Sequence, residues 1–70
     1  MERLRALRRR AMLTQKELAE RVGVTYQTVQ SWEAGNAEPR LRHLRRLCEV
    51  LGVTPQELLG DEWNGGKAAA

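Results

Sequence analysis

The chain has 70 residues, of which 41% are hydrophobic and 30% charged, with a net charge of +3; this composition allows one small globular domain. A single cysteine (Cys48) and a single histidine (His43) exclude an internal disulfide and a zinc site built from Cys and His ligands. No segment approaches the ~20 apolar residues of a membrane span, and arginines interrupt the first residues, so we expect neither a membrane partner nor a signal peptide.

Apolar residues at helical spacing predict five helices and no strand. The predicted helices cover roughly residues 2–11, 14–21, 25–34, 40–51 and 54–59. The fourth shows the longest apolar stripe, made of Leu41, Leu44, Leu47, Cys48 and Leu51. We expect residues 1–60 to form the domain and residues 61–70, which show no sustained pattern, to be a flexible tail.

A threonine marks the start of three of these helices. Thr14, Thr25 and Thr54 each follow an apolar residue and precede an apolar helical segment, which is typical of an N-cap. Glutamates three residues later predict a reciprocal capping box at Thr14 and at Thr54. Glycines at positions 23 and 52 follow periodic segments, as C-terminal glycines do.

Arginines gather in two clusters, which favours a polyanionic partner, either nucleic acid or an anionic membrane surface. The clusters are Arg3, Arg5, Arg8, Arg9 and Arg10, and Arg40, Arg42, Arg45 and Arg46. The alternative is that these arginines only coat solvated helix faces, which we expect for Arg45 and Arg46. We expect a surface position for His43 and a small buried hydrophobic role for Cys48.

The stretch from Gln15 to Glu33 has the pattern of two short helices joined by a tight turn. Ala19 supplies a small side chain where the helices cross, and Gly23 supplies the positive φ that the turn needs. Val29 lies inside the second helix, where it fills the wedge between the two. A generic helical hairpin is the alternative, although this spacing of Ala, Gly and Val is restrictive.

The segments Leu13–Thr25 (LTQKELAERVGVT) and Val29–Gly35 (VQSWEAG) resemble the helix-turn-helix of the phage repressor and Cro family, also called the xenobiotic-response-element family. The resemblance extends from Leu4 to Gly60. It implies an all-α, five-helix, lambda-repressor-like DNA-binding domain whose third helix enters the major groove of double-stranded DNA. It also implies a transcriptional regulator, repressor or Cro-like, that binds a near-palindromic operator as a homodimer in the cytoplasm.

The same resemblance assigns roles to individual residues. The positions matching base readers are Tyr26, Gln27, Gln30 and Ser31. The positions matching phosphate contacts are Gln15, Thr25, Asn36, Arg40 and Arg42. Arg8 and Glu33 match a pair that holds the recognition helix, and Ala19, Gly23, Val29 and Trp32 match structural positions. Leu59 and Trp63 match the region of the dimer interface, with the alternative that Trp63 folds back on its own core.

Other classes of function remain beside this one. An antitoxin or another protein-interaction module can be built on the same fold, because fold does not determine function. A membrane-surface peptide led by the basic first helix is disfavoured, since the domain core needs the few apolar residues of that helix. A catalytic nucleophile with its base and orienting group is not apparent, so we expect no enzymatic activity, no metal or other cofactor and no small-molecule ligand.

Overall fold

The computed structural model describes residues 1–60, which form five helices and no strand. The helices are α1 (Glu2–Arg10), α2 (Gln15–Val22), α3 (Tyr26–Ala34), α4 (Leu41–Leu51) and α5 (Pro55–Leu59). These bounds agree with the predicted ranges to within one residue at each end. Residues 61–70, and with them the expected tail and Trp63, lie outside the described residues.

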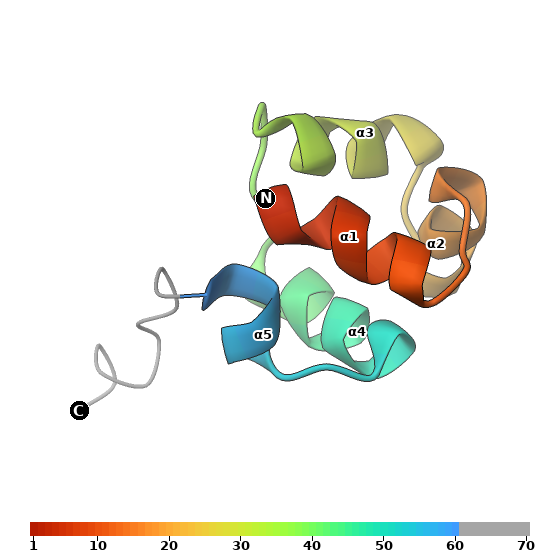
Figure 1. Cartoon of the computed structure of the whole chain (residues 1–70). Helices are drawn as coiled ribbons and strands as arrows, with labels where there is room; N and C mark the ends of the chain where they lie inside the picture. The colour runs from red at the N-terminus through yellow and green to blue at the C-terminus, as the bar shows by residue number, and fades with distance from the viewer. Residues whose placement is uncertain (61–70) are drawn as a thin grey trace.

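The first helix lies at the centre of the bundle, with α3 packed on one side and α5 on the other (Figure 1). The second helix packs against α3 and α4, and α4 packs against α5. One apolar core joins all five helices, and it consists of Leu4, Leu13, Leu18, Ala19, Val22, Val29, Trp32, Leu47, Leu51 and Leu58. No helix within residues 1–60 is long and apolar enough to cross a membrane.

Threonine caps begin α2, α3 and α5, as the sequence predicts. The hydroxyl of each threonine accepts the backbone N–H three residues later, at Glu17, Thr28 and Glu57. The reciprocal bond of a capping box is present at Thr14, whose N–H donates to the Glu17 carboxylate at 2.9 Å. Because these bonds satisfy N–H groups that the helix itself cannot, they fix where each helix begins.

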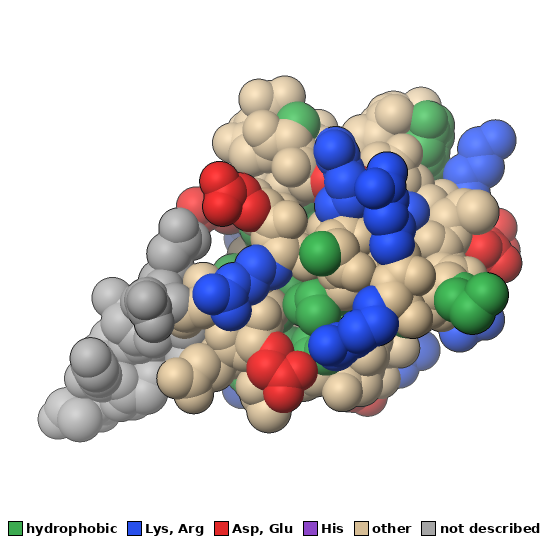
Figure 2. Space-filling model, viewed as in Figure 1, with side chains coloured by type: hydrophobic (Ala, Val, Ile, Leu, Met, Phe, Trp, Pro, Cys, Tyr) green, Lys and Arg blue, Asp and Glu red, His purple; other side chains and the backbone are tan. Residues whose placement is uncertain are grey.

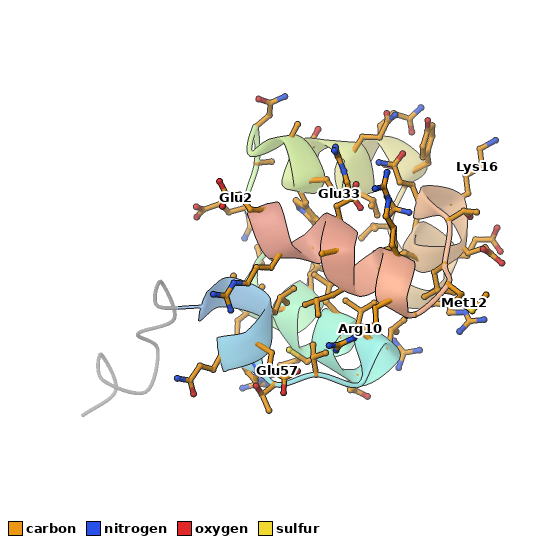
Figure 3. All side chains as sticks on the ribbon, viewed as in Figure 1. Glu2, Arg10, Met12, Lys16, Glu33 and Glu57 are labelled. Carbon is orange, nitrogen blue, oxygen red and sulfur yellow. The ribbon has the colours of Figure 1, made fainter. Side chains whose placement is uncertain are left out.

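The predicted capping box at Thr54 is wrong, because the Glu57 carboxylate turns to α1 instead. Its Oε2 lies 3.9 Å from the Arg10 guanidinium (Figure 3). The two residues border a shallow groove of about 370 Å³ between α1 and α5, and apolar side chains are visible near this junction (Figure 2). The carboxylate therefore helps to hold α5 on α1 rather than closing the first turn of α5.

Two other side chains of the predicted pattern differ from expectation. Leu41 is 52% exposed, because the core contacts of α4 begin one turn later, at Leu44. His43 is half-buried, and its ring packs at a tilt against Trp32 with 5.5 Å between centroids. Cys48 is partly buried against the core, and burial raises the pKa of its thiol, as for a packing residue.

Candidate nucleic-acid interface

The turn between α2 and α3 is built by Gly23. Its φ of +87° is left-handed, and its N–H and that of Val24 both donate to the Ala19 carbonyl, at 2.8 and 3.0 Å. Ala19 is buried at 3% exposure, where a larger side chain would push the helices apart. Val29 and Trp32, also buried, hold the inner face of α3 on the core. Thus the opposite face of α3 is left to solvent.

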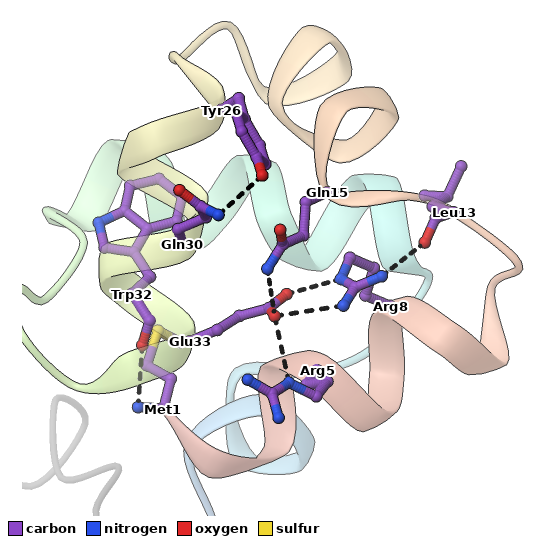
Figure 4. A network of polar contacts seen from close by, with 9 residues as sticks. All are labelled: Met1, Arg5, Arg8, Leu13, Gln15, Tyr26, Gln30, Trp32 and Glu33. Carbon is purple, nitrogen blue, oxygen red and sulfur yellow. Dashed lines mark hydrogen bonds and ion pairs between the residues drawn. The ribbon is translucent and has the colours of Figure 1, made fainter.

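The outward face of α3 carries the four residues that the sequence predicts as base readers. Gln27 and Gln30 are exposed, while Tyr26 and Ser31 are half-buried. Gln30 Nε2 donates to the Tyr26 hydroxyl at 2.8 Å, across one helical turn (Figure 4). Gln27 has no side-chain hydrogen bond to another residue within 1–60, so its amide is available to an outside partner.

A lysine at the start of α2 also contacts the Tyr26 ring. Lys16 Nζ lies 5.7 Å from the centroid of the Tyr26 ring, which is within the range of a cation–π contact. Sequence reasoning did not single out Lys16; its position directly after Gln15, at the start of the helix that faces α3, was the available signal. The lysine brings a positive charge to the first turn of α2, beside the face of α3 that carries Tyr26.

A buried ion pair ties α3 to α1. Arg8 Nε and Nη2 donate to the two carboxylate oxygens of Glu33 at 2.6 and 3.2 Å, and Arg8 Nη1 donates to the Leu13 carbonyl at 3.0 Å. The Glu33 side chain is fully buried, and that of Arg8 is 10% exposed. Each of the three guanidinium nitrogens of Arg8 therefore donates to an acceptor, and a buried pair is tolerated when its groups are hydrogen-bonded in this way.

Two further residues donate to the same carboxylate. Gln15 Nε2 and Arg5 Nε both bond to Glu33 Oε1, at 3.0 and 3.4 Å (Figure 4). Burial raises the pKa of Glu33, but the hydrogen bonds from Arg8 and Gln15 and the charge of Arg8 outweigh it and lower the pKa overall. The carboxylate is therefore ionised at neutral pH. Through it, α1, α2 and α3 share one hydrogen-bond network.

The residues predicted to contact phosphate occupy three places around α3. Gln15 begins α2 and is half-buried in the Glu33 network, and Thr25 uses its hydroxyl to cap α3. Asn36 follows α3 and is exposed, and its N–H closes the end of that helix on the Ser31 carbonyl at 2.9 Å. Arg40 and Arg42 are exposed at the start of α4.

The start of α4 differs from the threonine-capped helices. Its N-cap residue is Arg40, which makes no side-chain cap, and no acidic residue lies in its first turn. The first N–H groups of α4 and the positive end of its dipole therefore lie in the same turn of the chain as Arg40 and Arg42. This combination attracts anions, and it adds a backbone contribution to the arginines that the sequence predicts as phosphate contacts.

Arg46 is not simply solvated, contrary to the sequence-based expectation. Its Nε donates to the Arg21 carbonyl at 3.0 Å, near the end of α2, and its Nη1 lies 3.6 Å from Glu49. A cation near a helix C-terminus satisfies a carbonyl that lacks a partner within the helix. Arg46 therefore links α4 to the C-terminal end of α2, the first helix of the helix-turn-helix.

Of the predicted dimer residues, the structure describes Leu59. It is partly buried against the core and lines a hollow of about 180 Å³ together with Met1, Glu38, Pro39 and Leu44. Trp63 lies outside the described residues. Within residues 1–60, no group of three or more His, Cys, Asp or Glu side chains is placed to hold a metal ion.

Comparison with known proteins is consistent with this geometry. A helix-turn-helix family model matches residues 4–58. The chain is 36% identical over 61 residues to the HTH-type transcriptional activator BcrR of Enterococcus faecalis, covering 87% of this chain and 30% of that protein. It is 37% identical over 62 residues to the HTH-type transcriptional regulator DicA of Escherichia coli, covering 87% of this chain and 46% of DicA.

A shorter relative is matched over more of its length. The chain is 47% identical over 49 residues to an HTH-type transcriptional regulator of Methanothermobacter thermautotrophicus, covering 70% of this chain and 71% of that protein. The chain thus spans less than half the length of BcrR and of DicA. No solved structure gave a significant match.

Proposed function

This chain belongs to the helix-turn-helix family of the repressor and Cro type, and from that membership we propose that residues 1–60 bind double-stranded DNA sequence-specifically and regulate transcription. The observation that carries the proposal is the outward face of α3, a helix held rigidly by a buried ion pair yet exposing the Gln27 amide. A major groove about 12 Å wide admits one such helix. One relative is named an activator, so the proposal covers regulation in either direction.

In this proposal, the first turns of α3 read bases. The Gln27 amide offers one donor and one acceptor side by side, which suits N6 and N7 of adenine and gives about 1–3 kcal/mol of discrimination. Tyr26 and Gln30, joined by their hydrogen bond, present a second polar surface one turn along, next to the half-buried Ser31. Residues near the N-terminus of a recognition helix are those that reach base edges.

Phosphate contacts on both sides of α3 would fix its position in the groove. Gln15 and Thr25 stand at the starts of α2 and α3, and Asn36, Arg40 and Arg42 follow α3. The uncapped first turn of α4 strengthens the case for Arg40 and Arg42, because these two exposed arginines belong to the turn whose first N–H groups no side chain caps. These contacts carry affinity for any sequence and make binding dependent on salt.

We further propose that two copies bind a near-palindromic operator. Recognition helices in this class of protein read half-sites about 34–36 Å apart, which requires a dimer. The hollow beside Leu59, whose mixed lining of polar and apolar groups includes Met1, Glu38, Pro39 and Leu44, supports an interface there. The predicted contribution of Trp63 is part of the proposal and rests on sequence alone.

An enzymatic role is not part of this function, since the family consists of DNA-binding regulators. Binding of DNA needs no cofactor, and hydrogen bonds and charge account for every residue assigned above to a DNA contact. A regulator acts in the compartment that holds its DNA, so the proposal retains the cytoplasmic location expected from the sequence.

The experiment that tests this function is a binding selection from random duplex DNA at moderate salt, followed by sequencing of the enriched sites. We expect a palindrome with half-sites about one helical turn apart. A single enriched half-site would support sequence-specific DNA binding and contradict the proposed dimer. Absence of enrichment would overturn sequence-specific binding and favour the antitoxin or protein-interaction alternative.

A single substitution in α3, with a control in α4, tests whether α3 reads the base sequence. Gln27→Ala should weaken binding to the selected site by about 1–3 kcal/mol while leaving binding to random duplex nearly unchanged. Arg42→Ala is the control, because a phosphate contact should weaken both DNAs alike. An equal loss on both DNAs for Gln27→Ala would show that Gln27 does not read a base.

A further inference from the structure

The network around Glu33 carries an excess of positive charge. Two guanidinium groups, those of Arg5 and Arg8, meet one carboxylate, so the cluster has a net charge of +1. Arg8 is buried and uses Nε, Nη1 and Nη2 on protein acceptors. Arg5, in contrast, is bonded through Nε alone within residues 1–60, and its side chain is 55% exposed. The positive charge that Glu33 does not neutralise is therefore carried by the exposed side chain of Arg5.

The direction of the Arg5 side chain is set by its bond to Glu33. With Nε held at 3.4 Å from the carboxylate, the two Nη groups point away from it (Figure 4). An arginine fixed at one edge presents its remaining N–H donors in a planar fork, which suits a phosphate group. Basic side chains gather at this junction of α1 and α3 (Figure 2).

The position of Arg5 relative to the proposed DNA contacts follows from the shared oxygen. Gln15 Nε2 and Arg5 Nε both bond to Glu33 Oε1, at 3.0 and 3.4 Å, so these two nitrogens are at most about 6.4 Å apart. A phosphate that contacts Gln15 at the start of α2 is then within reach of the outward end of Arg5, which extends farther into solvent.

We propose that Arg5 contacts the DNA backbone from α1, on the phosphate next to Gln15. This rests on the proposed function and adds a residue to it that neither the resemblance nor the family match assigns. Glu33 acts as the positioning residue: it fixes the recognition helix through Arg8 and aims Arg5 at the phosphate through the same carboxylate. Glu33 would thus hold in place both the phosphate contact made from α1 and helix α3, which is proposed to read bases.

The test is the salt dependence of binding to a random-sequence duplex of about 20 base pairs, measured for the wild type, Arg5→Ala, Arg5→Lys and Arg10→Ala. One phosphate contact contributes about 0.9 to the slope of log K against log salt. We expect Arg5→Ala to reduce the slope by about one and Arg5→Lys to restore it. Arg10→Ala is the matched control, since it removes the same charge from the side of α1 that faces Glu57 of α5.

A purely structural role for Arg5 would lower thermal stability without changing the slope. We expect the slope to change and thermal stability to change little, because the Arg5 end of this long ion pair is exposed and Glu33 keeps its bonds to Arg8 and Gln15. An unchanged slope in Arg5→Ala, or an equal reduction in Arg10→Ala, overturns the contact while leaving DNA binding intact. Failure of the wild type to bind the duplex overturns the proposed function itself, and the two failures are therefore distinct.

Discussion

Arg8 and Glu33 are 25 residues apart in sequence and form a two-point ion pair in which the Glu33 side chain is fully buried. The pair joins the second half of α1 to the last turn of α3, so it ties the proposed recognition helix to the first helix. Leu13, Gln15 and Arg5 make further hydrogen bonds to the pair. No buried side-chain nitrogen or oxygen in residues 1–60 lacks a partner.

Removing Arg8 should therefore destabilise the domain strongly. Arg8→Ala leaves the Glu33 carboxylate buried with only Gln15 and Arg5 as donors, and breaking a buried pair in this way costs about 3 kcal/mol. Urea denaturation followed by circular dichroism measures the change. Arg9→Ala, one residue along on the exposed side of α1, is the control and should change stability by less than about 0.5 kcal/mol. Similar losses for both variants would contradict the assigned role.

Acid should remove the stabilisation that Glu33 provides. Its pKa is lowered in the folded protein, so its contribution is complete above the ordinary glutamate pKa of about 4.3 and is lost as the pH falls through the folded value. The unfolding free energy of the wild type should then fall more steeply below pH 5 than that of Glu33→Gln. Glu17, whose pKa is also lowered, by its bonds to Thr14, titrates in both proteins and cancels in the comparison. Parallel curves would contradict the prediction.

Local signals in the sequence were sufficient to place the five helices. Thr14, Thr25 and Thr54 cap helices, and Gly23 and Gly52 end them in the left-handed region, because caps and C-terminal glycines depend on residues a few positions apart. The fold class expected from the resemblance is confirmed by the family match over residues 4–58. The exposure of Leu41 was not predictable in this way, because helical periodicity does not reveal where neighbouring helices end.

The contacts of the arginines depend on tertiary structure and are harder to predict. The resemblance pointed to the pairing of Arg8 with Glu33, but nothing local distinguishes Arg5 from Arg9 or Arg46 from Arg45. Arg5 differs because α3 passes beside it, and Arg46 because the end of α2 exposes the Arg21 carbonyl to it. Long flexible side chains take their partners from whichever chain segment folding brings within reach.

Substitution of Gly23 should strain the turn between α2 and α3. A Cβ built on Gly23 meets no atom within 4 Å, so the cost arises from its φ of +87° rather than from a clash. We expect Gly23→Ala to cost about 1–2 kcal/mol and the β-branched Gly23→Val to cost more. Gly23→Asn should cost less than Gly23→Ala, since asparagine tolerates this conformation. Melting temperatures measure the series, and a Val variant as stable as the wild type would refute the role of the turn.

Tyr26 and Gln30 should act on DNA as one unit rather than as two independent contacts. The hydrogen bond from Gln30 Nε2 fixes the Tyr26 hydroxyl as an acceptor, so the tyrosine proton and the Gln30 carbonyl are the groups left for a base. Because each residue orients the other, loss of either should disturb both, and the losses should not add. Contacting residues of this kind show interaction energies of about 0.5–3 kcal/mol.

The measurement is a double-mutant cycle on binding to the selected operator, with Tyr26→Phe, Gln30→Ala and the double variant. We expect the sum of the single losses to exceed the loss of the double variant by at least ~0.5 kcal/mol. Asn36→Ala combined with Tyr26→Phe is the control, because Tyr26 begins α3 and Asn36 follows its end, with about 12 Å of helical rise between Tyr26 and Ala34, so the two losses should be additive. Additivity for Tyr26 and Gln30 as well would mean that their hydrogen bond is given up when DNA is bound, and that each residue finds its own partner in the groove.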